Sequence, residues 1–305
     1  MPYAQNVEPD HDLNRKILLT GIGIFVTGVL VLSMLSASGV GFPAVIAILV
    51  IVFLLFWFSA DIAMFGMGAT EVSPAEAPAL HAIVDKLIFF ADMPKPRIAI
   101  ADTACMNAFA AGRSPSASVV CVTSGLQNEL TEDELMAVLS HEIAHVAHRD
   151  VAMMTLASIV TLLAGMLTRA TFWNATTPSG VGGRKRGPGS NFAVALTLYT
   201  TSVLLGLALS RYREFVADRT GSIITGKPEF LITALQKVEA ASRGTSKTSP
   251  AMTHETFNTF FIIPALGNRE GQSLAAIFST HPPTSERIDR LRSLQQQLGS
   301  SSTSV

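Results

Sequence analysis

The chain has 305 residues, of which 49% are hydrophobic and only 15% are charged. A composition this apolar is typical of a membrane protein and argues against a disordered chain. The formal net charge is −1, so no excess of basic residues supports binding of nucleic acid.

Two uncharged hydrophobic runs follow a polar N-terminal segment over residues 1–14. Arg15 and Lys16 precede the first run, from Ile17 to about Val40, and the second run extends from Pro43 to Ala60. About 20 apolar residues suffice to cross a hydrocarbon core. A secretory signal peptide begins similarly, but the first run is long and a second follows directly. We therefore expect a transmembrane hairpin over residues 15–60.

A polar-apolar pattern replaces the hydrophobic runs from residue 61 onward. Apolar residues with helical spacing predict an amphipathic helix that ends near Met93–Pro96, with His81 at its surface. Three short strand-like runs separated by turn residues then predict a small β-sheet. These runs are Arg97–Ala101, Met106–Ala111 and Ser118–Val122. Two cysteines, Cys105 and Cys121, lack metal-binding spacing and are expected to be free and buried.

The stretch from His141 to His145 reads His-Glu-Ile-Ala-His. Residues four apart lie on one helix face, so both histidines can bind a single ion, and Glu142 can act as a general base in zinc-assisted hydrolysis. Thr131 and Glu134 form a capping-box pattern that predicts the start of this helix. The alternative is a helix that contains the five residues by accident. A metzincin is excluded, because that class needs Gly and His where this chain has His148 and Val151.

Two further uncharged runs follow, Val151–Leu167 and Phe192–Leu209. They are somewhat short but long enough to span, so residues 151–209 are expected to form a second transmembrane hairpin. A hairpin buried within a soluble domain is the alternative. The loop between the runs carries a basic cluster of Arg184, Lys185 and Arg186.

The remaining residues, 210–298, are predicted to complete the catalytic domain that begins at 61–150. Glu214 and Asp218 lie one helical turn apart. Glu214 can be the third metal ligand and Asp218 can accept the outer N–H of a ligand histidine. A solvated, charged helix face is the alternative. A final helix is expected after His281, followed by a disordered tail at 299–305.

In order along the chain, these motifs resemble the HtpX family of bacterial membrane proteases, which is related to the CAAX prenyl proteases. The resemblance covers roughly residues 14–298 and rests on five segments: Asn107–Gly112, Thr123–Leu126, His141–His145, Glu214–Asp218 and Ser279–Pro283. It implies a mainly α, multi-pass membrane protein with a small β-sheet and a zincin-type metalloprotease domain.

The resemblance also implies roles for further residues. His281 is the expected partner of the oxyanion, with Arg287 as a second candidate. An edge strand is expected to bind extended substrate by adding it to the sheet, although an internal strand remains the alternative. That strand comprises Asn107, Ala108, Phe109, Ala110 and Ala111. The implied substrates are misfolded or damaged membrane proteins, in protein quality control.

A shared metal ion constrains the topology. His145 precedes the third run and Glu214 follows the fourth, so those two ends must lie on one side of the bilayer. Arg15 and Lys16 flank that side, and the positive-inside bias makes it the cytoplasm. The basic loop at 184–186 conflicts with that bias if the second hairpin spans.

The sequence therefore predicts a zinc endopeptidase of the cell inner membrane, with Zn²⁺ held by His141, His145 and Glu214. Its expected partners are unfolded membrane proteins and the lipid bilayer, and its oligomeric state cannot be read. A prenyl-protein protease of narrow specificity is a rival, but four spans are few to enclose a chamber. A catalytically silent scaffold is a second rival, although neither Glu142 nor any ligand is altered.

Overall fold

The computed structural model describes residues 10–38, 42–176, 190–244 and 282–302. The chain forms two compact units that alternate along the sequence. One unit comprises His11–Leu55 and Met153–Ser210, and the other comprises Met1–Asp10, Phe56–Ala152 and Arg211–Val305. The predicted basic loop, most of the polar segment before residue 282, and His281 lie outside the described residues.

Long apolar helices dominate the first unit. They are α1 (His11–Ser38), α2 (Phe42–Trp57), and most of α7 (Asp150–Thr176) and of α8 (Ser190–Thr225). Among the described residues, α1, α7 and α8 are each long and apolar enough to cross a membrane, and α2 passes the same test jointly with α3 (Ser59–Met67). Both helices of the second hairpin are longer than the sequence predicted. Three or four spans are thus available.

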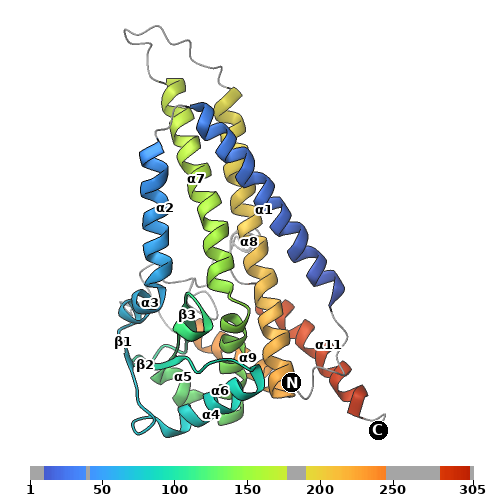
Figure 1. Ribbon diagram of the computed structural model, residues 1–305. Coiled ribbons are helices and arrows are strands. Elements are labelled where there is room, and N and C mark those ends of the chain that lie inside the picture. The colour runs from blue at the N-terminus through green and yellow to red at the C-terminus, as the bar shows by residue number, and fades with distance from the viewer. Residues whose placement is uncertain (1–9, 39–41, 177–189, 245–281, 303–305) are drawn as a thin grey trace. The chain divides into compact units, whose positions relative to one another are not determined.

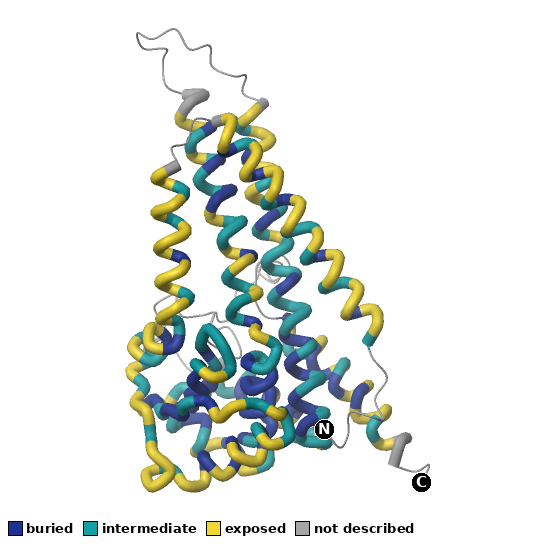
Figure 2. Tube along the Cα trace, in the orientation of Figure 1, coloured by how far each residue is buried: buried dark blue, intermediate teal, exposed yellow. Residues whose placement is uncertain are grey.

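Exposed apolar side chains mark these helices as membrane segments. Figure 2 shows α1 and α2 exposed over most of their length. Leu18, Phe25 and Leu32 on α1 are 63%, 71% and 52% exposed. Apolar exposure on this scale is rare in water but is expected in lipid. The unit has a small core of its own, formed by Val31, Leu35, Leu163, Ala164, Leu167 and Ala195.

The second unit contains a four-stranded sheet with the order β1-β2-β4-β3. Its strands are β1 (Ala69–Glu71), β2 (Arg97–Ala101), β3 (Ala108–Gly112) and β4 (Ser118–Thr123). β2 and β4 are parallel, and the other two pairs are antiparallel. Within this sheet β3 is an edge strand, as expected.

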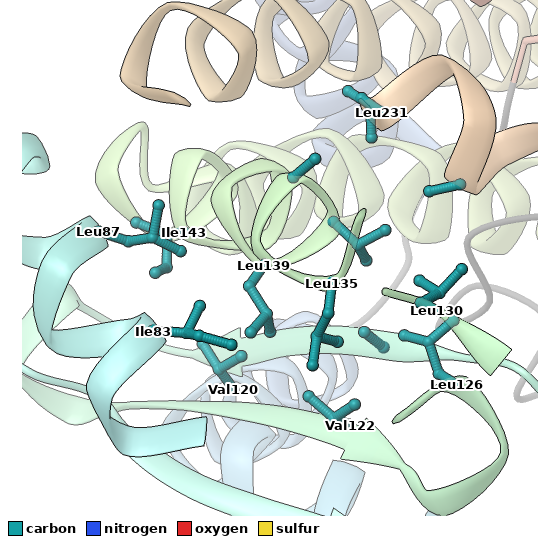
Figure 3. Packing of buried hydrophobic residues seen from close by; sticks show 14 of the residues in the cluster. Ile83, Leu87, Val120, Val122, Leu126, Leu130, Leu135, Leu139, Ile143 and Leu231 are labelled. Atoms are coloured by element: carbon teal, nitrogen blue, oxygen red, sulfur yellow. The ribbon is translucent and has the colours of Figure 1, made fainter. Parts of the chain in front are cut away.

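Helices α3, α5 (Ser124–Glu129) and α6 (Glu132–Ala147) pack directly against this sheet. Also in the unit (Figure 1) are α4 (Pro78–Ala91) and α9 (Pro228–Gly244), which pack on α6, and α11 (Thr284–Ser302), which packs on α9. α6 is central and contacts α4, α9, β3 and β4. Figure 3 shows Leu135 and Leu139 of α6 pointing toward Val122 and Val120 of β4, and Ile143 of α6 lying beside Leu87 of α4.

The start of α6 follows from its sequence. Thr131 and Glu134 form the predicted capping box, with side-chain to backbone hydrogen bonds in both directions. Losing such a cap typically costs about 1 kcal/mol. The apolar stripe on one face of α6 then buries that face in the core, and the opposite face is left to carry the histidines.

Several details differ from the sequence prediction. His81 is buried, and its Nε2 lies within hydrogen-bonding distance, 3.0 Å, of the carbonyl oxygen of Val72. Cys121 is free and buried as expected, whereas Cys105 is only partly buried. The last helix continues through Ser302, into the segment expected to be a disordered tail. Strand β1 and helix α3 were not predicted as separate elements.

Candidate metal centre

His141 and His145 on α6 and Glu214 on α8 bring their ligand atoms together. The two Nε2 atoms are 3.1 Å apart, and the Glu214 carboxylate oxygens lie 3.6 Å from Nε2 of His141 and 3.4 Å from Nε2 of His145. Ligand atoms of a tetrahedral ion at ordinary bond lengths are roughly 3.3–3.6 Å apart. The group therefore fits a tetrahedral metal ion with one open position.

The outer nitrogen of His141 is held by Asp218. Nδ1 of His141 lies 2.9 Å from Oδ1 of Asp218. Burial would lower the pKa of His141, but the hydrogen bonds to Asp218 and Glu214 outweigh it and raise the pKa. A proton on Nδ1, donated to Asp218, leaves the lone pair of Nε2 for the metal. This contact shows which histidine Asp218 serves.

Arg287 on α11 binds Asp218 from the far side. Its Nε and one terminal nitrogen lie 2.8 Å and 2.6 Å from the two Asp218 oxygens. Arg287 is only 1% exposed. Burial would lower its pKa, yet the charge of Asp218 raises it, so the guanidinium stays charged. A buried carboxylate needs such a partner, since an uncompensated buried charge is strongly destabilising.

A second set of contacts of the same kind holds His145. Nδ1 of His145 lies 2.6 Å from Oδ2 of Asp150. Arg213 pairs with the other oxygen of Asp150 and also donates to the carbonyl of His148 at 3.3 Å. Each ligand histidine thus has its own aspartate, and each aspartate has its own arginine.

The sequence analysis missed Asp150 and Arg213. Asp150 follows His145 by five positions, beyond the end of α6, so helical periodicity does not link the two residues. Between them Arg149 adopts a left-handed conformation with φ +57°. That conformation is uncommon outside glycine, and it lets the chain turn from α6 into α7. The only indication in the sequence was that an acidic residue, Asp150, follows the candidate ligand His145 closely.

Close packing of α8 on α6 brings Glu214 to the histidines. A Cβ atom added to Gly221 would lie 2.9 Å from the backbone nitrogen of His141. Ser140 donates from Oγ to the carbonyl of Gly221 at 3.1 Å. Only glycine permits this approach, and it places Glu214, two turns earlier on α8, beside the histidine pair.

Glu142 lies next to the ligand atoms and is buried. Burial is the main reason why its pKa is raised, and the charges of His141 and His145 and a hydrogen bond from the Ala110 backbone oppose that rise. A carboxylate with a raised pKa, beside a metal position, suits a general base.

The hydrogen bond from Ala110 also shows which way the edge strand faces. The amide of Thr123 donates to the Asn107 carbonyl at 3.0 Å, and bonded pairs alternate along an antiparallel ladder. Ala108, Ala110 and Gly112 therefore turn their backbone groups away from β4. A small pocket lined by Ala110–Gly112 and His145 lies beside this open edge. Asn107 itself precedes β3, and both its backbone N and O are bonded to Thr123.

The other candidates are placed as follows. His281 lies outside the described residues. Arg287 binds Asp218, which in turn binds Nδ1 of His141. His148 caps the end of α6 and is not a member of the ligand group. Burial, with the nearby charge of Arg213, lowers its pKa to about 4, so it is neutral at pH 7.

Comparison with known proteins places the chain in a family. Residues 74–295 match the profile of peptidase family M48. "Protease HtpX homolog" of Moorella thermoacetica is 41% identical over 295 residues, covering 95% of this chain and 96% of that protein. "Protease HtpX homolog 1" of Streptomyces coelicolor is 38% identical over 295 residues, covering 93% and 94%.

A solved structure has the same fold. The crystal structure of S. mikatae Ste24p superposes with a TM-score of 0.56 at 18% sequence identity. The match covers 86% of this chain and 61% of the Ste24p chain. The chain therefore spans under two thirds of that protein's length. With the family match and the apolar helices, these findings show that the chain is a membrane-embedded metalloprotease and belongs to peptidase family M48.

Proposed function

We propose that the protein is a zinc endopeptidase in which His141, His145 and Glu214 bind the ion and Glu142 is the general base. The observation that supports this most strongly is that ligand atoms of all three residues converge. In both histidines, Nδ1 is also bound by an aspartate. Two nitrogens and one carboxylate, with a fourth position open, is the donor set of catalytic zinc.

In this proposal the metal ion and Glu142 have separate roles in hydrolysis. When bound, zinc supplies a Lewis acid that stabilises the negative charge developing on the scissile carbonyl. Glu142 takes a proton from the attacking water and then gives it to the leaving amine. Its buried position raises its pKa and so suits it to both transfers.

The tetrahedral oxyanion needs a second hydrogen-bonding group. We assign that role to His281. Arg287 is a weaker candidate, because two of its nitrogens already bind Asp218. Its role in the proposal is to hold Asp218, and through it the His141 ring.

The substrates are unfolded segments of membrane proteins, which fits quality control. Ala108, Ala110 and Gly112 on the open edge of β3 can bind an extended backbone, so recognition depends little on side chains. The Ala110 amide lies at Glu142, so a segment bound along this edge passes the general base. A quality-control protease needs such breadth, whereas a prenyl-protein protease of narrow specificity does not.

The active site faces the cytoplasm in this proposal. α7 begins just after His145 and α8 carries Glu214 near its C-terminal end. The chain between them therefore leaves and returns on one side of the bilayer. Arg15 and Lys16 at the start of α1 assign that side to the cytoplasm.

The test is cleavage of an unfolded substrate by protein purified in detergent. We expect a strong chelator to abolish cleavage and stoichiometric zinc to restore it. Cleavage that persists after metal analysis shows no bound metal would rule out the mechanism. A metal-loaded protein that cleaves no unfolded substrate would instead favour a silent scaffold.

A further inference from the structure

Helix α3 has two opposite apolar faces. On one face Ala60 and Ala63 are buried and pack with Phe109, Ala111 and other residues of the sheet. On the opposite face Phe58, Ile62 and Phe65 are 48%, 41% and 89% exposed. Their spacing of four and three positions forms one stripe along a helix.

No part of the chain that the structure describes buries this stripe. Phe65 is the most exposed of the large apolar residues in the described part of the chain. The flank of the helix is polar, since Asp61 is paired with Arg97 at 2.9 Å. An apolar stripe beside a charged flank is typical of a helix that lies in the membrane interface.

The chain itself places α3 at the end of a membrane helix. Phe58 directly follows Trp57, the last residue of α2, and α2 is apolar along its whole length. Trp57 contacts Arg113, whose guanidinium lies 4.2 Å from the ring centroid and donates to the Trp57 carbonyl at 3.3 Å. Tryptophan and arginine are both favoured where a membrane helix meets water.

We propose that α3 is an interfacial helix whose Phe58, Ile62 and Phe65 insert into the lipid surface while its other face supports β3. The occupant of the stripe is the bilayer, because α3 follows the wholly apolar helix α2 in the chain after a single residue and turns from it by 67°. β3 then lies within about one helix diameter, roughly 10 Å, of lipid.

This placement adds a substrate class, and here the inference rests on the proposed function. An edge strand so close to lipid would receive chain segments that emerge from the bilayer surface. Soluble unfolded chains would reach the same strand only by diffusion. Segments next to a transmembrane helix are therefore the favoured substrates.

The test measures lipid contact without any activity. Cys121 is fully buried, so replacing Cys105 alone leaves no reactive thiol. An environment-sensitive dye on Phe65→Cys should be quenched by brominated acyl chains when the protein is in a bilayer nanodisc. The matched control is Phe89→Cys on α4, which replaces the same residue type at 80% exposure. That dye should be quenched by aqueous iodide and not by the lipid.

Three results would overturn the proposal. A dye at Phe65 that iodide quenches and brominated lipid does not would show that the stripe faces water. A dye shielded from both would show that a second copy or another protein covers it. Equal lipid quenching at Phe65 and Phe89 would show that α3 has no preferential contact with the bilayer.

A second experiment tests the substrate class separately. Phe65→Asp should lower cleavage of a substrate embedded in the bilayer several-fold and leave cleavage of an unfolded soluble substrate in detergent unchanged. Phe89→Asp should change neither. Absence of both activities in the parent protein would count against the proposed function, whereas unchanged cleavage of both substrates by Phe65→Asp would count against the role of α3 alone.

Discussion

Each histidine of the candidate metal centre is held by a separate pair of charged residues. His141 is bound by Asp218 and Arg287, and His145 by Asp150 and Arg213. The residues come from four different helices, so the orientation of the imidazole rings depends on the packing of the whole unit. Such outer partners fix the tautomer of a ligand and make it a better donor to the metal.

These contacts predict graded losses of metal affinity. Asp218→Asn and Asp150→Asn should each weaken zinc binding by about 10–100-fold, because the ring nitrogen loses its charged acceptor. Competition with a fluorescent chelator measures this directly. Asp133→Asn is the control, since the Asp133 side chain is 46% exposed and its ion pair with Lys227 is long, at 3.9 Å. Unchanged affinity in Asp150→Asn would mean that the second pair is structural only.

Glu142 should affect chemistry and not metal content. Glu142→Gln keeps the shape of the side chain but removes the base, so we expect turnover to fall by about 10²–10⁴-fold. Zinc measured by mass spectrometry should stay at one ion per chain. Near-normal cleavage by a preparation free of other proteases would show that another group acts as the base.

The sequence indicated the three candidate ligands that the structure brings together, but not the residues that hold them. His141, Glu142 and His145 are linked by helical spacing, which is a local property. Asp150 and Arg213 are linked only through the turn at Arg149 and the approach of α8, which are properties of the folded chain. His81 was expected at the surface for a related reason, since its partner Val72 lies in another segment.

At the scale of elements, the contact between α6 and α8 determines whether the site can form. Gly221→Ala would place a Cβ 2.9 Å from the His141 backbone, and backbone cannot yield as a flexible side chain can. We expect a loss of roughly 1–3 kcal/mol in stability, together with weaker zinc binding as Glu214 is displaced.

Gly206→Ala on the same helix is the matched control. A Cβ at Gly206 would meet nothing within 4 Å, so the variant should match the parent in melting temperature and zinc content. Thermal unfolding in detergent and metal analysis measure both quantities. Equal behaviour of the two variants would show that α8 can move away from α6 without loss.

Elements with strong periodicity were predicted well, and short ones were not. The amphipathic helix α4, strand β2 and the capping box of α6 all follow from local pattern. The boundary predicted at Ala60 divides α3, because Ser59 and Ala60 fall in the second hydrophobic run and residues 61–67 were assigned to the catalytic domain without a helix. The separation of α3 from α2 becomes clear only through its packing on the sheet. β1 has three residues, too few for a pattern.

At the scale of the whole molecule, the two compact units are interleaved along the chain. His145 precedes the second hairpin in the sequence and Glu214 follows it, yet both lie in one unit. The chain must therefore return to the side of the bilayer from which the hairpin started. A cysteine at Ser73 should be protected from an impermeant reagent in intact cells. A cysteine at Ser179, in the connection between α7 and α8, should react if the hairpin spans.

The outcomes distinguish the remaining topologies. Labelling at Ser73 without labelling at Ser179 would contradict a cytoplasmic active site. Protection of both until the cells are lysed would show that the second hairpin does not cross. The sequence alone left this open, because the length of the two apolar runs favours spanning whereas the basic residues at 184–186 oppose it.

The position of Arg287 has a consequence for biosynthesis. α11 is synthesised after all four long apolar helices, and it brings the positive charge that balances Asp218. Until that helix docks, a buried carboxylate lacks its counter-charge and His141 lacks a fixed orientation. In a chain that is being synthesised, His141 therefore gains this support only after the apolar helices α1, α2, α7 and α8 have been made.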